Sequence, residues 1–116
     1  MRKVIHVFYL VTTLFAVASC NAQHKVPDYT NAMLVDVRTE EEFAGGSVKG
    51  AVNIPVDEVE DRLAEFGHDR QIVVFCRSGS RSSRAMSILK SHGYDNVSNG
   101  GTWQQVNDVI NSKKSK

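Results

Sequence analysis

A strongly apolar run leads directly into a small polar loop near the middle of this chain. Residues 71–75 read Gln-Ile-Val-Val-Phe, and they are followed by Cys76 and then by Arg-Ser-Gly-Ser-Arg-Ser over residues 77–82. A helical pattern of apolar residues begins after this loop and covers residues 83–92. A buried strand, a short loop and a helix in this order are typical of a β-α-β unit, so the chain is expected to build a mainly parallel sheet covered by helices.

The rest of the chain alternates between strand and helix patterns, and the connections are too long for hairpins. Thr39 and Glu42 form a capping box, which predicts a short helix that ends at Gly45. The apolar residues between 56 and 66 recur at helical spacing, which predicts one amphipathic helix there. Strands are expected over 33–37, 51–55, 72–75 and 96–98, and a last helix over 103–110. This alternation indicates an α/β fold with a small, mainly parallel sheet of four to five strands.

The first twenty residues have the pattern of a signal peptide. A basic start, Met1-Arg2-Lys3, precedes an apolar segment over 4–17 that has no acidic residue and is short for a membrane span, which needs roughly 20 residues. The run Val-Ala-Ser-Cys over 17–20 resembles a bacterial lipobox, in which the cysteine, here Cys20, is lipidated and becomes the new N-terminus. Ala-Val-Ala over 16–18 also fits simple signal cleavage, so soluble secretion remains an alternative.

We therefore divide the chain into a signal peptide (1–19), a tether (20–30) and one folded domain (31–116). Loss of 19 of the 116 residues leaves 97, which is enough for a single core. Loss of Arg2 and Lys3 reduces Lys and Arg from 14 to 12 against 13 acidic residues, a net charge of −1 that does not indicate a nucleic-acid partner. The expected location is the periplasm, with a lipid anchor in the outer membrane at Cys20.

Cys76 is the one cysteine left to the folded domain, so it has no partner for an intramolecular disulfide. Loop N–H groups, the start of a helix, and the side chains of Arg77 and Arg81 all favour a thiolate over a thiol at this position. Cys76 is therefore predicted to be a nucleophile, and the alternative is a buried, inert cysteine. His68 and His92 have no spacing that pairs them with Cys76, so neither a metal site nor a cofactor is expected.

Three motifs, taken in order, resemble a single-domain rhodanese of the small exported type. They are Leu-Val-Asp-Val-Arg over 34–38, Gly-Ala-Val-Asn-Ile-Pro over 50–55, and Val-Val-Phe-Cys-Arg-Ser-Gly-Ser-Arg-Ser over 73–82. The resemblance implies a three-layer fold in a monomer with thiosulfate sulfurtransferase activity. It also implies that Cys76 takes sulfur from a small anionic donor such as thiosulfate, forms a persulfide, and passes the sulfur to cyanide or to a thiol acceptor, which can be a protein.

The same resemblance assigns roles to the residues around Cys76. The loop that binds the substrate would consist of Arg77, Ser78, Gly79, Ser80, Arg81 and Ser82. Asp36 and Arg38 would support this loop rather than react. Ser47 stands where many relatives carry a histidine, and the short Gly-Gly-Thr-Trp ending over 100–103 leaves the place of Trp103 open.

Other functions remain as alternatives to the sulfurtransferase. The related phosphatases have five residues between cysteine and arginine, whereas four separate Cys76 from Arg81, so a phosphatase is the weakest of them. A persulfide carrier or thiol-redox protein that acts with a protein partner would use the same cysteine. The third alternative is a binding module that retains the fold but catalyses no reaction.

Overall fold

Four short strands form one parallel sheet in the order β2-β1-β3-β4. The computed structural model describes residues 26–115, and its strands are β1 (Met33–Asp36), β2 (Val52–Asn53), β3 (Ile72–Cys76) and β4 (Val97–Thr102). β3 is an inner strand and all five of its residues are buried. The predicted α/β fold with a small, mainly parallel sheet of four to five strands is confirmed.

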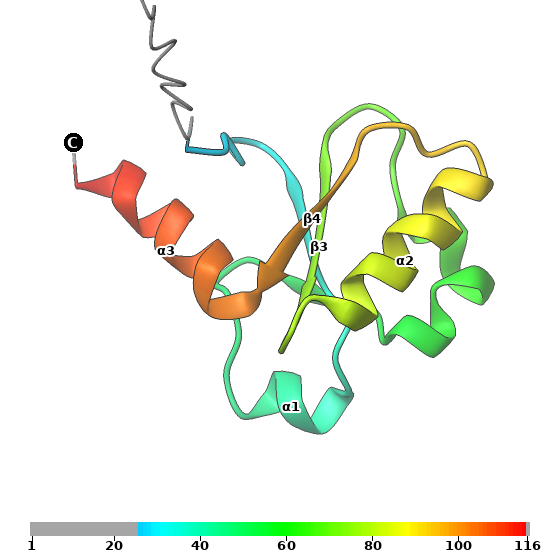
Figure 1. Ribbon diagram of the computed structural model, residues 1–116, viewed down its shortest axis with the longest axis horizontal. Coiled ribbons are helices and arrows are strands. Elements are labelled where there is room, and N and C mark those ends of the chain that lie inside the picture. Colours follow the sequence, from blue (N-terminus) through cyan, green and yellow to red (C-terminus); the bar gives the residue numbers. More distant parts are fainter. Residues whose placement is uncertain (1–25, 116) are drawn as a thin grey trace, which may run out of the picture.

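Helices cover both faces of this sheet (Figure 1). α2 (Ser80–Ser91) and α3 (Trp103–Lys114) pack on opposite faces, because successive side chains of β3 point to opposite sides. Ile72, Val74 and Cys76 join the cluster that contains Ala85 and Leu89 of α2, while Val73 and Phe75 join the cluster that contains Val106 of α3. The thiol of Cys76 therefore belongs to the α2 side of the core.

Three helices begin at the carboxyl edge of the sheet, two of them with a threonine capping box and one after a glycine. Thr39 caps α1 (Glu40–Ala44) through the predicted capping box with Glu42, and Thr102 forms a second capping box with Gln105 at the start of α3. Gly79 precedes α2 with φ of 92°, a left-handed conformation that favours glycine. The N–H groups at the start of α2 therefore lie next to Cys76, the last residue of β3.

The segment between β2 and β3 corrects one prediction. The spacing of its apolar residues predicts an amphipathic α-helix over 56–66, but the structure has two 3₁₀ helices, η1 (Val56–Glu58) and η2 (Glu60–Glu65), with Arg62 outside helical geometry. A 3₁₀ helix has three residues per turn, so Val56 and Val59 are buried on one side of it as they would be in an α-helix. Spacing by three residues does not distinguish the two.

Several boundaries also differ from the sequence prediction, and two of them lie at the Cys76 loop. α2 begins at Ser80 rather than at residue 83, since the Ser83 N–H already donates to the Gly79 carbonyl, 3.0 Å away. The last strand extends past the predicted 96–98 through the glycine pair to Thr102. The loop after Cys76 is therefore only three residues long, and Ser80, Arg81 and Ser82 belong to the first turn of the helix.

The predicted signal peptide, the lipidation site Cys20 and the first part of the tether lie outside the described residues. The end of the tether contacts the domain, since Tyr29 packs against the cluster of α3 and Asp28 forms an ion pair with Lys113. Within residues 26–115, no helix is both long enough and apolar enough to span a membrane.

Candidate active site

The Cys76 sulfur lies at the end of β3, beneath the start of α2, and has no exposed surface. The Gly79 N–H donates a hydrogen bond to it over 3.0 Å, and the Ser82 hydroxyl lies 3.4 Å from it. The short loop thus turns back over the sulfur, as the sequence predicts. The loop residues Arg77 and Ser78 are exposed, but the sulfur is not.

Hydrogen bonds to the sulfur favour the thiolate. Burial raises the pKa of the Cys76 thiol, but hydrogen bonds from the Ser82 hydroxyl and from the backbone N–H groups of Ser82, Ser78 and Gly79 outweigh it. The resulting pKa is about 7, compared with an ordinary value of 9.0. Close to half of Cys76 is therefore a thiolate at neutral pH, which is the reactive form of a cysteine.

Asn99 of β4 holds the loop from the other side, and the sequence analysis did not single it out. Its side-chain oxygen accepts from the Ser82 hydroxyl (2.7 Å) and from the Gly101 N–H (2.9 Å), and its side-chain nitrogen donates to the Gly79 carbonyl (3.1 Å). Ser82 and Asn99 are 17 residues apart in the sequence. The glycine pair after Asn99 was the one sequence signal for an irregular strand here.

Arg81 forms a bidentate ion pair with Glu42 of α1. Its two terminal nitrogens lie 2.7 and 3.1 Å from the two carboxylate oxygens, and both side chains are about one-third exposed. Hydrogen bonds from Arg81, together with those from Thr39, lower the pKa of Glu42 to about 2 against the effect of burial. Arg81 thus lies beside the loop, as predicted, but its guanidinium is held by a carboxylate rather than directed at the sulfur.

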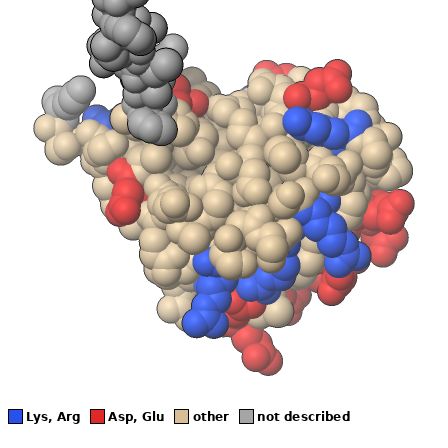
Figure 2. All heavy atoms as spheres, viewed as in Figure 1, with Lys and Arg blue, Asp and Glu red and all other residues tan. Residues whose placement is uncertain are grey.

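Three other residues of the predicted substrate-binding set lie at the surface. Arg77, Ser78 and Ser80 are exposed, and the hydroxyls of Ser78 and Ser80 lie 3.3 Å apart. Figure 2 shows basic side chains gathered with acidic ones on the lower part of the face, where Figure 1 places α1 and the start of α2. Two of the basic residues there have acidic partners, since Arg84 pairs with Asp57 as Arg81 does with Glu42.

Asp36 and Arg38 form a second arginine–carboxylate pair at the end of β1. Arg38 donates to both carboxylate oxygens of Asp36 over 2.7–3.0 Å, and the Ser47 hydroxyl donates to the same carboxylate over 2.7 Å. Arg38 also donates to the Gly46 carbonyl and lies over the ring of Trp103. The pair is buried and holds the segment after α1 and the start of α3, so its support of the Cys76 loop is indirect.

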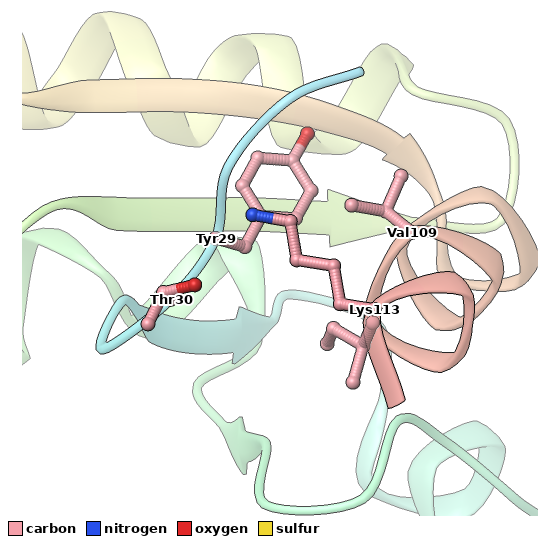
Figure 3. Close-up of a pocket in the computed structure, with 5 residues that line it drawn as sticks. Tyr29, Thr30, Val109 and Lys113 are labelled. Atoms are coloured by element: carbon pink, nitrogen blue, oxygen red, sulfur yellow. The ribbon is translucent and has the colours of Figure 1, made fainter. Parts of the chain in front are cut away.

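A small cavity lies elsewhere on the domain. It has a volume of about 110 Å³ and lies between residues 29–30 and α3, where Tyr29, Thr30, Val109, Ile110 and Lys113 line it (Figure 3). None of these residues belongs to the Cys76 loop. Among residues 26–115, no group of three or more His, Cys, Asp or Glu side chains is arranged to hold a metal ion.

Comparisons with known proteins agree with the motifs and the fold. A family profile described as "Rhodanese-like domain" matches residues 20–101. A "Sulfurtransferase" of Allochromatium vinosum is 37% identical over 75 residues, which cover 65% of this chain and 70% of that protein. The "Thiosulfate sulfurtransferase PspE" of Escherichia coli is 36% identical over 83 residues, which cover 70% and 80%.

A solved structure has the same arrangement of elements. It is described as a rhodanese with anions from E. coli, and it superimposes with a TM-score of 0.60 at 34% identity. The superposition covers 64% of this chain and 89% of the other. The likeness therefore includes nearly the whole of that domain.

Proposed function

Because the chain belongs to the rhodanese family, we propose that it is a sulfurtransferase that takes sulfane sulfur from a small anionic donor such as thiosulfate and carries it on Cys76. The observation that carries the proposal is the set of hydrogen bonds to the Cys76 sulfur from the loop and the start of α2. These donors stabilise a negative charge on sulfur, which both the thiolate and the persulfide have.

The first half of the reaction forms the persulfide. The Cys76 thiolate attacks the outer sulfur of thiosulfate, the S–S bond of thiosulfate breaks, and sulfite leaves with the electron pair of that bond. The product on the enzyme is Cys76–S–S⁻, and no proton or external electron is needed. Total charge is conserved, because one thiolate and one dianion become one persulfide anion and one dianion.

The second half returns the thiolate. An acceptor nucleophile, either cyanide or a thiolate, attacks the terminal sulfur of the persulfide and takes it, and Cys76 leaves as the thiolate. Since Cys76 has no exposed surface, both donor and acceptor reach it only when the side chains above it move. Arg77, Ser78 and Ser80 are the exposed residues of the loop and the first turn of α2, so they lie where the anions would approach.

The decisive experiment incubates the purified protein with thiosulfate and cyanide and measures thiocyanate. We expect thiocyanate from the wild type and from Cys20→Ser but not from Cys76→Ser. Mass spectrometry after thiosulfate alone should show one added sulfur atom on the tryptic peptide 71–77. Absence of both the added sulfur and thiocyanate in the wild-type protein would rule out the proposed reaction.

The burial of Cys76 favours a protein acceptor as the second candidate. A partner protein that displaces the loop side chains could collect the sulfur where a small thiol cannot. Persulfide on Cys76 without transfer to cyanide or to small thiols would identify this carrier function. Transfer to cyanide at a rate typical of enzymes, with kcat above about 1 s⁻¹, would favour the sulfurtransferase that turns over alone.

We further propose that the chain is exported to the periplasm and anchored by lipid at Cys20. The support comes from the sequence: a basic start, an apolar segment over 4–17 and Val-Ala-Ser-Cys over 17–20. The protein expressed in a Gram-negative host should fractionate with the outer membrane, and Cys20→Ser should release it from that fraction. Recovery of the wild type in the soluble periplasm would support simple cleavage instead.

A further inference from the structure

The Ser82 hydroxyl has a single proton and three possible acceptors. The Asn99 side-chain oxygen is 2.7 Å away, the Gly79 carbonyl 3.0 Å and the Cys76 sulfur 3.4 Å. When Cys76 is a thiol, its S–H can donate to the Ser82 oxygen while the Ser82 proton goes to Asn99. When Cys76 is a thiolate, it can only accept, so the Ser82 proton has to turn away from Asn99 to reach it.

Both competing acceptors keep a partner after that turn. The Asn99 oxygen still accepts from the Gly101 N–H at 2.9 Å, and the Gly79 carbonyl still accepts from the Asn99 side-chain nitrogen at 3.1 Å. The Ser83 N–H is a second donor to the same carbonyl. An unpaired buried polar group costs about 1–3 kcal/mol, and this arrangement avoids that cost in either state of the cysteine.

The backbone fixes which way the Asn99 amide faces. The Gly101 N–H can only donate, so it requires the oxygen of Asn99, and the Gly79 carbonyl can only accept, so it requires the nitrogen. A serine or threonine hydroxyl would have to meet both backbone groups through one oxygen atom, whereas the Asn99 amide meets them through two separate atoms. The carboxamide therefore holds the Gly101 N–H and the Gly79 carbonyl with its oxygen and its nitrogen respectively.

A bulge in β4 positions Asn99 for this contact. Val74 is paired with Asn99 and Phe75 with Gly101, so Gly100 is the extra residue of the bulge. A Cβ atom at Gly100 would lie 2.5 Å from Val106, and Gly101 has φ of 81°. The sequence Asn-Gly-Gly thus meets two requirements, a side chain that reaches the Cys76 loop and a backbone that only glycine permits.

We propose that Asn99 is a positioning residue, which holds the proton of the Ser82 hydroxyl while Cys76 is a thiol and releases it to the sulfur when Cys76 is charged. Asn99 does not touch the reacting sulfur and acts through Ser82 and Gly79. The Ser82 proton would stabilise the persulfide in the same way, because the charge of the persulfide also lies on sulfur. The inference rests on Cys76 as the reactive cysteine, and it is independent of which donor or acceptor the protein uses.

The test measures the rate at which iodoacetamide alkylates Cys76 as a function of pH. The full-length protein is used, and alkylation is read on the tryptic peptide 71–77 by mass spectrometry, which separates Cys76 from Cys20. This reaction needs no thiosulfate. The inference about Asn99 can therefore fail while the proposed sulfur transfer stands, and sulfur transfer can fail while the inference stands.

Two substitutions at Asn99 should shift the profile in opposite directions. Asn99→Asp gives the Ser82 proton a charged acceptor and removes the donor to Gly79, so the midpoint should rise by about one pH unit, which is roughly a tenfold slower reaction at pH 6. Asn99→Ala removes the competing acceptor and should lower the midpoint. If Asn99 only stabilised the fold, both substitutions would shift the midpoint of the pH profile in the same direction. That outcome would overturn the proposal.

Ser82→Ala is the second arm of the test. Without the hydroxyl there is no proton for Asn99 to hold, so Asn99→Asp should shift the midpoint much less in this background. An equal shift in both backgrounds would mean that only the added charge acts, and the proposal would fail. Asn96→Asp is the matched control, because it adds the same charge beside the opposite end of β3 and should leave the profile unchanged.

Discussion

Two arginine–carboxylate pairs lie at the carboxyl edge of the sheet, and they differ in burial. Arg38 and Asp36 are 6% and 0% exposed, and their shortest contact is 2.7 Å. Arg81 and Glu42 have the same shortest contact but are 33% and 28% exposed. The buried pair has additional partners in Ser47 and Gly46, whereas Arg81 has Glu42 as its one ion-pair partner within residues 26–115.

If the chain transfers sulfur as proposed, this difference distinguishes a structural arginine from one that the donor anion could recruit. A buried charge that loses its partner is strongly destabilising, so the Arg38 pair has to remain intact throughout the reaction. A partly exposed pair is worth only about 0–1 kcal/mol, which an incoming anion can replace. Arg81 is therefore the arginine that could exchange a carboxylate for the donor anion, while Arg38 keeps the edge of the sheet in place.

The largest expected effect comes from breaking the buried pair. Asp36→Asn leaves Arg38 charged and buried without a carboxylate, so the free energy of unfolding should fall by about 3–5 kcal/mol. Urea unfolding followed by circular dichroism measures this loss. If the variant does not fold, the double variant Asp36→Leu with Arg38→Met, which removes both charges, should restore a folded protein. A loss below about 1 kcal/mol for Asp36→Asn would mean that this pair contributes no more to stability than an ion pair at the surface.

The second effect concerns the pH dependence of Cys76 and tests whether either arginine controls the thiolate. The pKa of Cys76 is about 7 because neutral donors surround the sulfur. The reaction with iodoacetamide should therefore fall roughly tenfold between pH 8 and pH 6. Because these donors are neutral, raising the salt concentration from 0.05 to about 0.5 M should move the midpoint little. A large shift with salt would show that the arginines, rather than the loop hydrogen bonds, stabilise the charge.

The parts of this site that the sequence predicts are local in the chain. Cys76, its loop and the Thr39–Glu42 capping box each lie within a few consecutive residues, and their chemistry is fixed by spacing along the backbone. The sheet was also predictable, since a buried parallel strand has an apolar run such as the one that forms β3. The rhodanese motifs identified the family from the same local runs.

The contacts that the sequence did not predict join residues far apart. Glu42 and Arg81 are 39 residues apart, and nothing in either motif indicates that the arginine predicted to bind the substrate is paired with α1. Asn99 follows the strand predicted over 96–98, and its contact with the Cys76 loop depends on the bulge at Gly100. Pairing of this kind depends on the packing of whole elements, which local patterns do not contain.

The third effect separates the two arginines by kinetics. Glu42→Gln releases Arg81 from its carboxylate, so the KM for thiosulfate should fall by up to roughly fivefold, which is the equivalent of a partly exposed ion pair. The pKa of Glu42 is about 2, so this pair is present above the ordinary value of 4.5 and is lost only as the pH falls toward 2. The effect on KM should therefore be the same from pH 5 to pH 8.

Glu41→Gln is the matched control for the Glu42 variant. It removes the same charge from the same helix, but Glu41 has no ion-pair partner within residues 26–115. If the two variants change the KM equally, the effect comes from the general charge of α1 and not from the release of Arg81. Arg81→Gln should raise the KM, because it removes the cation itself.

The smallest effect is expected from the pair between Arg84 and Asp57, which is more exposed than the other two arginine–carboxylate pairs. Their side chains are 63% and 83% exposed and their contact is 3.2 Å, so water and salt screen the interaction. Asp57→Asn should change the free energy of unfolding by no more than about 0.5 kcal/mol and leave the KM for thiosulfate unchanged. A lower KM in Asp57→Asn would mean that Arg84, which lies one turn after Arg81 in α2, also binds the anion.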